Sequence, residues 1–288
     1  MLKRFFISAL LMACSLASQA ETSVWKVNKG NETVYIGGTV HLLRSTDFPL
    51  PDEFDIAYRN SDRVFFETDM TALSDPSTQQ KLAIAMMAEP NHTIDKLLAP
   101  ETLEQLADAA TKRGLDLNAL MPFKASMIMM MLEVSEMQRM GLTVEGVDAY
   151  FNDRATQDAI PTDELETLAA QLAFLSKMGE GNEEEFVQLS LRDLDKLEDL
   201  YDEIILAWRK GDRKQLGALL INDMKQDFPE VYEALLAERN SNWLPIIHTM
   251  FEEPGTEYVL VGAAHLIGPD GLLQRLEKQG YAVAHVQE

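Results

Sequence analysis

One short phrase occurs near each end of the 288-residue chain. Residues 34–43 read VYIGGTVHLL, and residues 258–267 read YVLVGAAHLI. In both, an apolar run rich in β-branched residues, typical of a buried strand, leads into a turn of the form Gly-x-x-His-Leu. The chain has five histidines, and two of them, His41 and His265, thereby follow a predicted strand, one in each half of the chain. Ligands and catalytic groups collect at the carboxyl edge of α/β sheets, so the repeat predicts two halves of one site.

The other strand signals also lie near the chain ends, with a long helical region between them. Strands are predicted at residues 24–27, 33–39, 63–67, 257–261 and 281–285, and helices at 53–60, 100–113, 122–140, 163–178, 183–210, 213–224 and 229–251. Because the first and last strands must meet to unite the two histidines, we expect one sheet built from both chain ends. The fold class is then α/β or α+β, with a large helical insertion at about residues 75–250. The alternative is a separate helical lobe at about residues 75–158.

The amino terminus has the pattern of a secretory signal. Lys3 and Arg4 precede an apolar stretch that is too short to span a membrane, and small residues end at Ala20. We therefore expect a signal peptide at residues 1–20 and a periplasmic or secreted location. The alternative is a lipoprotein anchored through Cys14, the only cysteine of the chain.

The charge of the chain excludes two classes of partner. The formal net charge is −22, and removal of Lys3 and Arg4 with the signal, without any acid, changes it to −24. Nucleic acid and anionic lipid would be repelled, so neither is an expected partner. No later apolar run is long enough to cross a bilayer, so we expect no stable membrane insertion after signal removal. A mature chain without cysteine has no disulfide, and its stability must come from a buried core.

Glu67 is the last residue of a third predicted strand, at residues 63–67, and the three residues before it are apolar. A charged residue after a buried run is either an ordinary strand end that meets water or a placed acid. If the strand at 33–39 and this strand are parallel neighbours joined by the helix at 53–60, Glu67 and His41 emerge at the same edge. Both strand-end histidines are expected to be neutral imidazoles at neutral pH, able to bind a metal or to act as a base.

Four further polar residues carry weaker signals. Glu166 is the last of three acidic residues in the segment 163–166. The periodicity alone predicts that this residue is exposed to solvent. Arg239 lies in a predicted helix, where most arginines form surface ion pairs, although it could bind a substrate carboxylate or orient a metal-bound acid. Asp148 and Asn240 lie in stretches of no more specific pattern.

Several familiar catalytic signatures are absent from the sequence. There is no His-Glu-x-x-His, no Gly-x-Ser-x-Gly, no phosphate-binding or calcium-binding loop and no catalytic cysteine. The commonest plans for hydrolases are therefore excluded.

Short segments along the chain resemble the TraB/GumN family, also called the Tiki-like family. The matching segments follow the family's order and are residues 38–43, 66–69, 122–124, 146–151, 165–167 with Gln171, 239–240 with Trp243, and 261–266. The chain departs from the family at Phe123, where Trp is common, and before Leu165, where a Lys and a Gly are usual. The family is similar in fold to erythromycin esterases and haem-linked iron-regulated lipoproteins, and its animal members are described as metal-dependent proteases that trim secreted ligands.

The resemblance implies a family domain at residues 21–288 and assigns roles within it. It implies catalytic roles for His41, Glu67 and His265, which would bind a divalent metal together with Glu166. Around them, substrate contacts or orientation of the ligands are expected from Arg239, Asn240 and Asp148. Two histidines with one or two carboxylates suit Mn, Co, Zn or Fe and leave positions open for water.

These signals predict an exported metal-dependent hydrolase, above all a peptidase acting on a peptide or protein. One alternative is an esterase-like hydrolase without metal, in which His41 activates water and Glu67 orients it. Another is a non-enzymatic module that sequesters a peptide or a small-molecule ligand. The role of Glu67, as metal ligand or general base, stays open at this point.

The amino-terminal pattern gives the first testable prediction. Because the small residues that end at Ala20 meet the requirement of signal cleavage, the exported protein should begin at Glu21. Mass spectrometry of the intact exported protein and of its amino-terminal peptide measures this directly. A lipid-modified amino terminus at Cys14 would contradict it.

Overall fold

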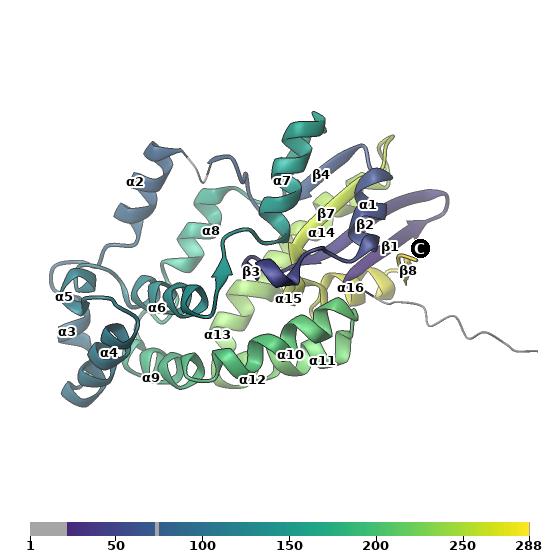
Figure 1. The fold of residues 1–288 in the computed structure, drawn as a ribbon. Coiled ribbons are helices and arrows are strands. Elements are labelled where there is room, and N and C mark those ends of the chain that lie inside the picture. The colour runs from purple at the N-terminus through teal and green to yellow at the C-terminus, as the bar shows by residue number, and fades with distance from the viewer. Residues whose placement is uncertain (1–21, 73–74, 288) are drawn as a thin grey trace, which may run out of the picture.

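The computed structural model describes residues 22–72 and 75–287, and the predicted signal peptide with Cys14 lies outside them (Figure 1). In the described part, six strands form one sheet in the order β6-β4-β7-β2-β1-β8. The strands are β1 (Val24–Lys29), β2 (Glu32–Thr39), β4 (Arg63–Phe66), β6 (Thr162–Glu164), β7 (Glu257–Gly262) and β8 (Ala282–His285). A second, two-stranded sheet pairs β3 (Leu43–Arg44) with β5 (Leu142–Thr143).

Helices surround the six-stranded sheet and fill most of the segment between β4 and β7. They are α1 (Asp52–Arg59), α2 (Pro76–Ala85), α3 (Ile94–Leu97), α4 (Pro100–Lys112), α5 (Leu117–Leu120), α6 (Ala125–Arg139), α7 (Val147–Asp158), α8 (Leu168–Leu175), α9 (Glu183–Leu194), α10 (Leu197–Arg209), α11 (Arg213–Leu220), α12 (Asn222–Asp227), α13 (Pro229–Tyr232), α14 (Glu238–Met250), α15 (Ala263–Leu266) and α16 (Leu272–Lys278). A 3₁₀ turn at Ser45–Asp47 follows β3. A π-helical turn at Glu233–Ala237 joins α13 to α14.

Four strands of the sheet run parallel and place their carboxyl ends at one edge. β7 pairs in parallel with both β2 and β4, and β4 pairs in parallel with β6. β1 is antiparallel to β2 and to β8. The parallel strands are covered on both faces, which explains why Tyr258 to Val261 of β7 are apolar without alternation and fully buried. The prediction of one mixed sheet built from both chain ends is confirmed.

One detail of the predicted topology is wrong. β2 and β4 are parallel, but they are not neighbours, because β7 from the far end of the chain lies between them. The apolar run of β7 offers backbone donors and acceptors to both flanking strands. His41 and Glu67 therefore leave strands that are two positions apart, with the β7 end between them.

The helices also differ from the prediction, because α7, which carries Asp148, was not predicted and several predicted helices are divided. Residues 163–178, predicted as one helix, contain β6 and then α8, because the backbone N–H of Leu165 donates to the carbonyl of Phe66 and holds this segment on the edge of β4. Residues 183–210 form two helices, α9 and α10. The apolar period continues across the break between them, so the pattern alone did not reveal it.

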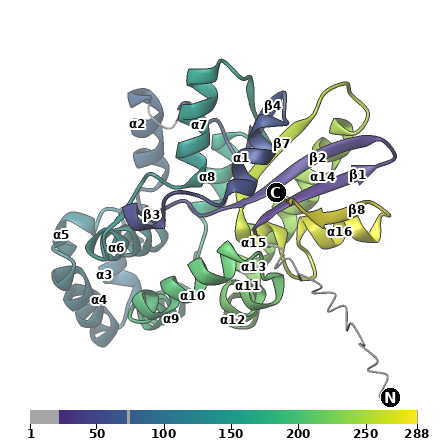
Figure 2. The ribbon, with the colours of Figure 1, turned by 45° about the vertical axis from the view of Figure 1, so that its right-hand side comes forward.

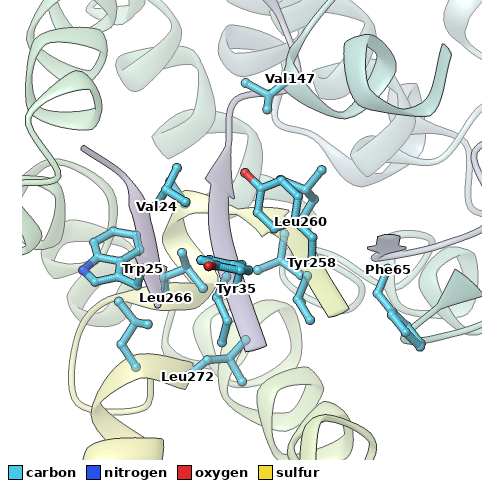
Figure 3. Packing of buried hydrophobic residues seen from close by; sticks show 14 of the residues in the cluster. Val24, Trp25, Tyr35, Phe65, Val147, Tyr258, Leu260, Leu266 and Leu272 are labelled. Atoms are coloured by element: carbon cyan, nitrogen blue, oxygen red, sulfur yellow. The ribbon is translucent and has the colours of Figure 1, made fainter. Parts of the chain in front are cut away.

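Two hydrophobic clusters stabilise the described residues. The larger one joins the sheet to helices on both faces: Phe151 of α7 contacts Tyr258 of β7 edge-on at 5.8 Å, and α14 and α16 pack on the opposite face (Figures 1 and 2). Figure 3 draws part of it, with Trp25 and Tyr35 beside residues of the helices that follow β7. The smaller cluster lies among α3 to α6 and α9. One domain with a helical insertion, the predicted organisation, stays a prediction.

Candidate active site

Each of the four parallel strands delivers one predicted site residue to the same edge of the sheet. His41 follows β2, Glu67 follows β4 directly, and His265 lies in α15, which begins directly after β7. Glu166 follows β6, and its backbone N–H donates to the carbonyl of Glu67 at 3.0 Å, which continues the ladder between β6 and β4. The carboxyl edge thus brings together all four residues that the sequence marked as catalytic or metal-binding.

Gly262 marks the point where three of these side chains converge. A Cβ built on Gly262 would lie 3.2 Å from Oε1 of Glu67, 3.6 Å from Nε2 of His41 and 3.7 Å from Cδ2 of His265. The backbone N–H of Gly262 donates to Oε1 of Glu67 at 2.7 Å. A glycine here leaves space between the two histidines and the carboxylate, which any larger residue would narrow.

Arg239 of α14 is the centre of the buried part of the site. Nη2 donates to Oε2 of Glu67 at 2.6 Å and to Oε1 of Glu166 at 2.7 Å, and Nε donates to the same Glu166 carboxylate at 3.0 and 3.2 Å. Nη1 donates to the carbonyl of Leu235 at 3.2 Å and contacts Nε2 of His265 at 2.9 Å. The five N–H groups of the guanidinium therefore all find acceptors. Its side chain is 8% exposed.

The hydrogen bonds of Asn240 fix the tautomer of His265. The amide nitrogen of Asn240 donates to the backbone carbonyls of His265 and Asp270 at 3.0 and 2.9 Å. Its oxygen therefore faces Nδ1 of His265 at 2.8 Å, and Nδ1 must carry the proton. Nε2 then accepts the bond from Arg239. Burial, reinforced by the charge of Arg239, lowers the pKa of His265 to about 3, so the ring is neutral.

Glu67 is held as a carboxylate. Burial alone would raise its pKa, but His265 once it is protonated in acid, the positive charges of Arg239 and His41, and the Gly262 N–H lower that pKa to about 2. Gln171 of α8 adds a donor to Oε2 at 3.3 Å. Glu67 therefore stays ionised throughout the neutral and mildly acidic range.

Trp243 packs against the side chains of Glu166, His265 and Arg239. Its indole N–H donates to Oε2 of Glu166 at 3.2 Å, and its ring lies 4.4 Å from the ring of His265 and 4.7 Å from the Arg239 guanidinium carbon. Trp243 itself is fully buried. The aromatic face thus shields the ion pairs from water, which strengthens them.

His41 differs from His265 in both exposure and charge. Its side chain is 59% exposed, whereas its partner Asp148, at the start of α7, is buried, with Oδ2 at 2.8 Å from Nδ1 of His41. The charge of the Asp148 carboxylate, together with its hydrogen bond, raises the pKa of His41 to about 9. The prediction that both histidines are neutral is therefore wrong for His41, because tertiary contact supplies a carboxylate 107 residues away.

The approach of α7 to the His41 loop depends on a glycine. The backbone N–H of Val147 donates to the carbonyl of Val40 at 3.0 Å. A Cβ on Gly146 would collide with the carbonyl of His41, so a larger residue there would push α7 away. Asp148 reaches His41 only because this contact is close.

The comparison with known proteins covers the whole site. A model of the TraB/PrgY/gumN family matches residues 23–285 of this chain. The chain belongs to this family. The resemblance drawn from the short motifs is therefore confirmed. The match includes every strand of the six-stranded sheet. No curated protein and no solved structure matches the chain.

The arrangement of this family member does not fit a metal bound by the predicted ligands. Among the described residues, no group of three His, Cys, Asp or Glu side chains is placed to hold a metal ion. Arg239 occupies Oε2 of Glu67, both oxygens of Glu166 and Nε2 of His265. A cation on those atoms would meet the positive guanidinium and would require Arg239 to leave. The metal assignment stays a prediction.

The sequence pattern underestimated the burial of two residues and missed two groups that contact Arg239. Glu166, which reads as solvated, is 12% exposed, and Arg239 is buried instead of forming a surface ion pair. The Leu235 carbonyl, which lies in the π-helical turn and accepts from Arg239, gave no sequence signal. Phe174, whose ring lies 5.9 Å from the Arg239 guanidinium carbon, could have been found, because it follows Gln171 by one helical turn.

Replacing Arg239 by Met tests whether it is the counterion of the site. The change leaves two buried carboxylates without a positive partner, so the free energy of unfolding should fall by about 3 to 5 kcal/mol. Urea denaturation measures this fall. The Arg59→Met variant is the control, because Arg59 is exposed and, within residues 22–72 and 75–287, forms an ion pair only with Asp55. The expected change is below about 1 kcal/mol.

The same variant tests what excludes a cation. With Arg239→Met, Nε2 of His265 and the two carboxylates lose the donors of the guanidinium and its positive charge, and they become available to a divalent ion. Isothermal titration with Mn(II), Co(II) and Zn(II) should therefore detect tighter binding to the variant than to the wild type. Tighter binding to the wild type would contradict the assignment of Arg239 as the resident cation.

Proposed function

We propose that this member of the TraB/PrgY/gumN family is a hydrolase that cleaves a peptide or ester bond with water activated by His41. One observation carries the proposal: Nε2 of His41 and Oε1 of Glu67 border the same space beside Gly262. A water molecule between them would contact a base and an oriented carboxylate at once. The other ring nitrogen of His41 is held by Asp148, so the free nitrogen faces that space.

The proposed reaction uses His41 first as base and then as acid. In the neutral form of His41, Nε2 takes a proton from water while the water oxygen attacks the carbonyl carbon, and the carbonyl electron pair moves to its oxygen. Collapse of the tetrahedral intermediate breaks the bond to the leaving nitrogen or oxygen, which receives the proton from the imidazolium. Asp148 keeps the ring oriented and stabilises the imidazolium, and Glu67 orients the water.

In this proposal the buried residues position Glu67 and do not themselves react. Arg239 and the N–H of Gly262 hold the two oxygens of Glu67 in fixed directions. His265 accepts a bond from Arg239 with its only free ring nitrogen, so it is a positioning residue here and not a second base. The negative charge retained on Glu67 also favours the imidazolium that His41 becomes during the reaction.

Metal-dependent peptidase activity, which the family resemblance implies, is the second candidate. The supporting observation is the convergence of two imidazoles and a carboxylate on one point beside Gly262. In this alternative, His41, Glu67, His265 and Glu166 would hold a divalent Mn, Co, Zn or Fe ion after Arg239 leaves, and the ion would supply a water of lowered pKa.

We also propose that the protein acts after export, in the periplasm or outside the cell. The order of basic, apolar and small residues that ends at Ala20 supports this. Among the described residues, no helix is long and apolar enough to cross a membrane. An exported hydrolase of this charge would meet peptide or small-molecule substrates in a compartment without nucleic acid.

Two variants test the proposed chemistry. Metal-free protein is incubated with a peptide library and with nitrophenyl esters, with and without Mn(II), Co(II) or Zn(II), and product is measured by mass spectrometry. We expect turnover without metal that falls about 100-fold or more in His41→Ala, because the base is lost. Gly262→Ala should have a similar effect, because its methyl group would lie 3.2 Å from Oε1 of Glu67. Lys278→Ala, which removes an exposed side chain of α16 outside the site and outside the two pockets near α8, should retain activity.

The possible outcomes separate the candidates. Turnover that requires added metal would overturn the metal-free reaction in favour of the second candidate. Absence of turnover under every condition would leave the non-enzymatic module that binds a ligand. Circular dichroism of each variant ensures that loss of activity is not loss of fold.

The raised pKa of His41 predicts the pH profile of the proposed hydrolase. Because the neutral imidazole is the base, kcat/KM should rise with pH and level off above about 9. Asp148→Asn removes the charge that raises this pKa, so the rise should move toward the ordinary value of 6.5, and the plateau should fall about 100-fold because the ring loses its orientation. Asp153→Asn, on the exposed face of the same helix, should leave the profile unchanged. An Asp148→Asn profile identical to wild type would rule out the dyad.

A further inference from the structure

A groove of 740 Å³ lies between α8 with the turn after it, α9, and the segment from α12 to the start of α14. Phe174 of α8 lines this groove and also lies 5.9 Å from the Arg239 guanidinium carbon. One turn earlier on α8, Gln171 donates to Glu67. On the opposite wall, Glu238 lines the groove and directly precedes Arg239. The groove and the buried cluster therefore share two walls, and Figure 1 shows α8 and α13 on the same side of the molecule.

The lining of the groove has an apolar part. Phe186 of α9 and Phe228 at the end of α12 meet edge to face at 6.1 Å, and Met178 and Val231 extend the same lining. Gly179, with a φ of +73°, lets the turn after α8 lie directly on Phe186, because a Cβ there would collide with that ring. Such a lining can accept apolar side chains of a bound chain.

The rim of the groove is acidic and largely unpaired. Glu180, Glu185, Glu230 and Glu238 line it and are exposed. Across the described residues, none of these four side chains has an ion pair or a hydrogen bond, whereas Asp227 is paired with Arg192. Lys177 is the single basic residue of the lining. Like charges gathered without counterions favour a positively charged ligand.

A second pocket makes this surface longer. It has a volume of 190 Å³, and it shares Met178 and Glu180 with the groove. The combined surface runs from the neighbourhood of Arg239 past the end of α8 to Lys124. An extended chain fits such a surface better than a compact small molecule does.

We propose that this groove binds a cationic, amphipathic peptide segment, with apolar side chains on the Phe186 and Phe228 lining and Lys or Arg side chains against the acidic rim. The inference rests on the proposed hydrolase function and names its substrate class: the bound segment lies beside the cluster of Arg239 and Glu67. Specificity then arises from charge on the rim and from hydrophobic contact on the lining.

Binding and cleavage are measured separately. The probe is a short fluorescein-labelled peptide of alternating Leu and Lys, and fluorescence anisotropy measures its binding to the His41→Ala protein, which does not turn it over in the proposed reaction. Two matched peptides carry Glu in place of Lys, or Ser in place of Leu. We expect the Leu and Lys peptide to bind at least tenfold more tightly than either, and its affinity to fall as salt is added.

The location of the site is tested with matched charge variants. Glu180→Gln with Glu230→Gln removes one unpaired acid from each wall and should weaken binding about fivefold. Glu32→Gln with Glu252→Gln removes the same charge from exposed positions outside the groove lining and should leave binding unchanged. Equal weakening in both double variants, or equal binding of all three peptides, would overturn the proposal.

Failure of this inference and failure of the proposed function are distinguishable. If the wild type hydrolyses nitrophenyl esters but the Leu and Lys peptide does not bind in the groove, only the substrate class is wrong. If that peptide binds with the expected charge dependence but no substrate is hydrolysed, the hydrolase proposal fails, and the groove remains a peptide-binding site.

Discussion

The buried contact of Arg239 with Glu67 and Glu166 is the constraint on which the rest of the site depends. Two carboxyl groups buried together at the carboxyl edge of the sheet require a counterion, and the guanidinium supplies it in a fixed, planar geometry. The same group uses its remaining N–H bonds on the Leu235 carbonyl and on His265. One side chain from α14 thus couples residues that follow three different strands. Because Arg239 contacts atoms of Glu67, Glu166 and His265, it also decides which side-chain atoms of the site remain free to contact water or a substrate.

The two histidines of the repeated phrase illustrate how tertiary environment divides equivalent residues. His265 is buried between Asn240 and Arg239, so both ring nitrogens are engaged and the imidazole is neutral. His41 is exposed and faces Asp148, so one ring nitrogen is free and the ring is readily protonated. A shared motif therefore yields one positioning residue and one residue that we propose as the catalytic base.

The segment between β4 and β7 supplies much of the surroundings of the site. It supplies β6 to the sheet, Asp148 on α7, Gln171 on α8 and Arg239 on α14, and the walls of the acidic groove come from α8, α9 and the segment from α12 to α14. The strands fix the positions of the proposed reacting groups, while the helices set their charge and the surroundings of a substrate. We consider this division of roles the reason that the groove adjoins the site.

The sequence by itself determined the positions of five of the six strands of the main sheet, the α/β or α+β fold class, the shared edge of His41, Glu67 and His265, and the family, because apolar runs and the repeated Gly-x-x-His phrase are local patterns. It could not determine that β7 lies between β2 and β4, that residues 162–164 add a strand, or that Glu166 and Arg239 are buried together, because these depend on pairing between distant segments. Protonation of His41 was likewise decided by the tertiary structure. A pKa responds to charges within a few ångströms, and the Asp148 carboxylate reaches His41 only after α7 has packed against the end of β2.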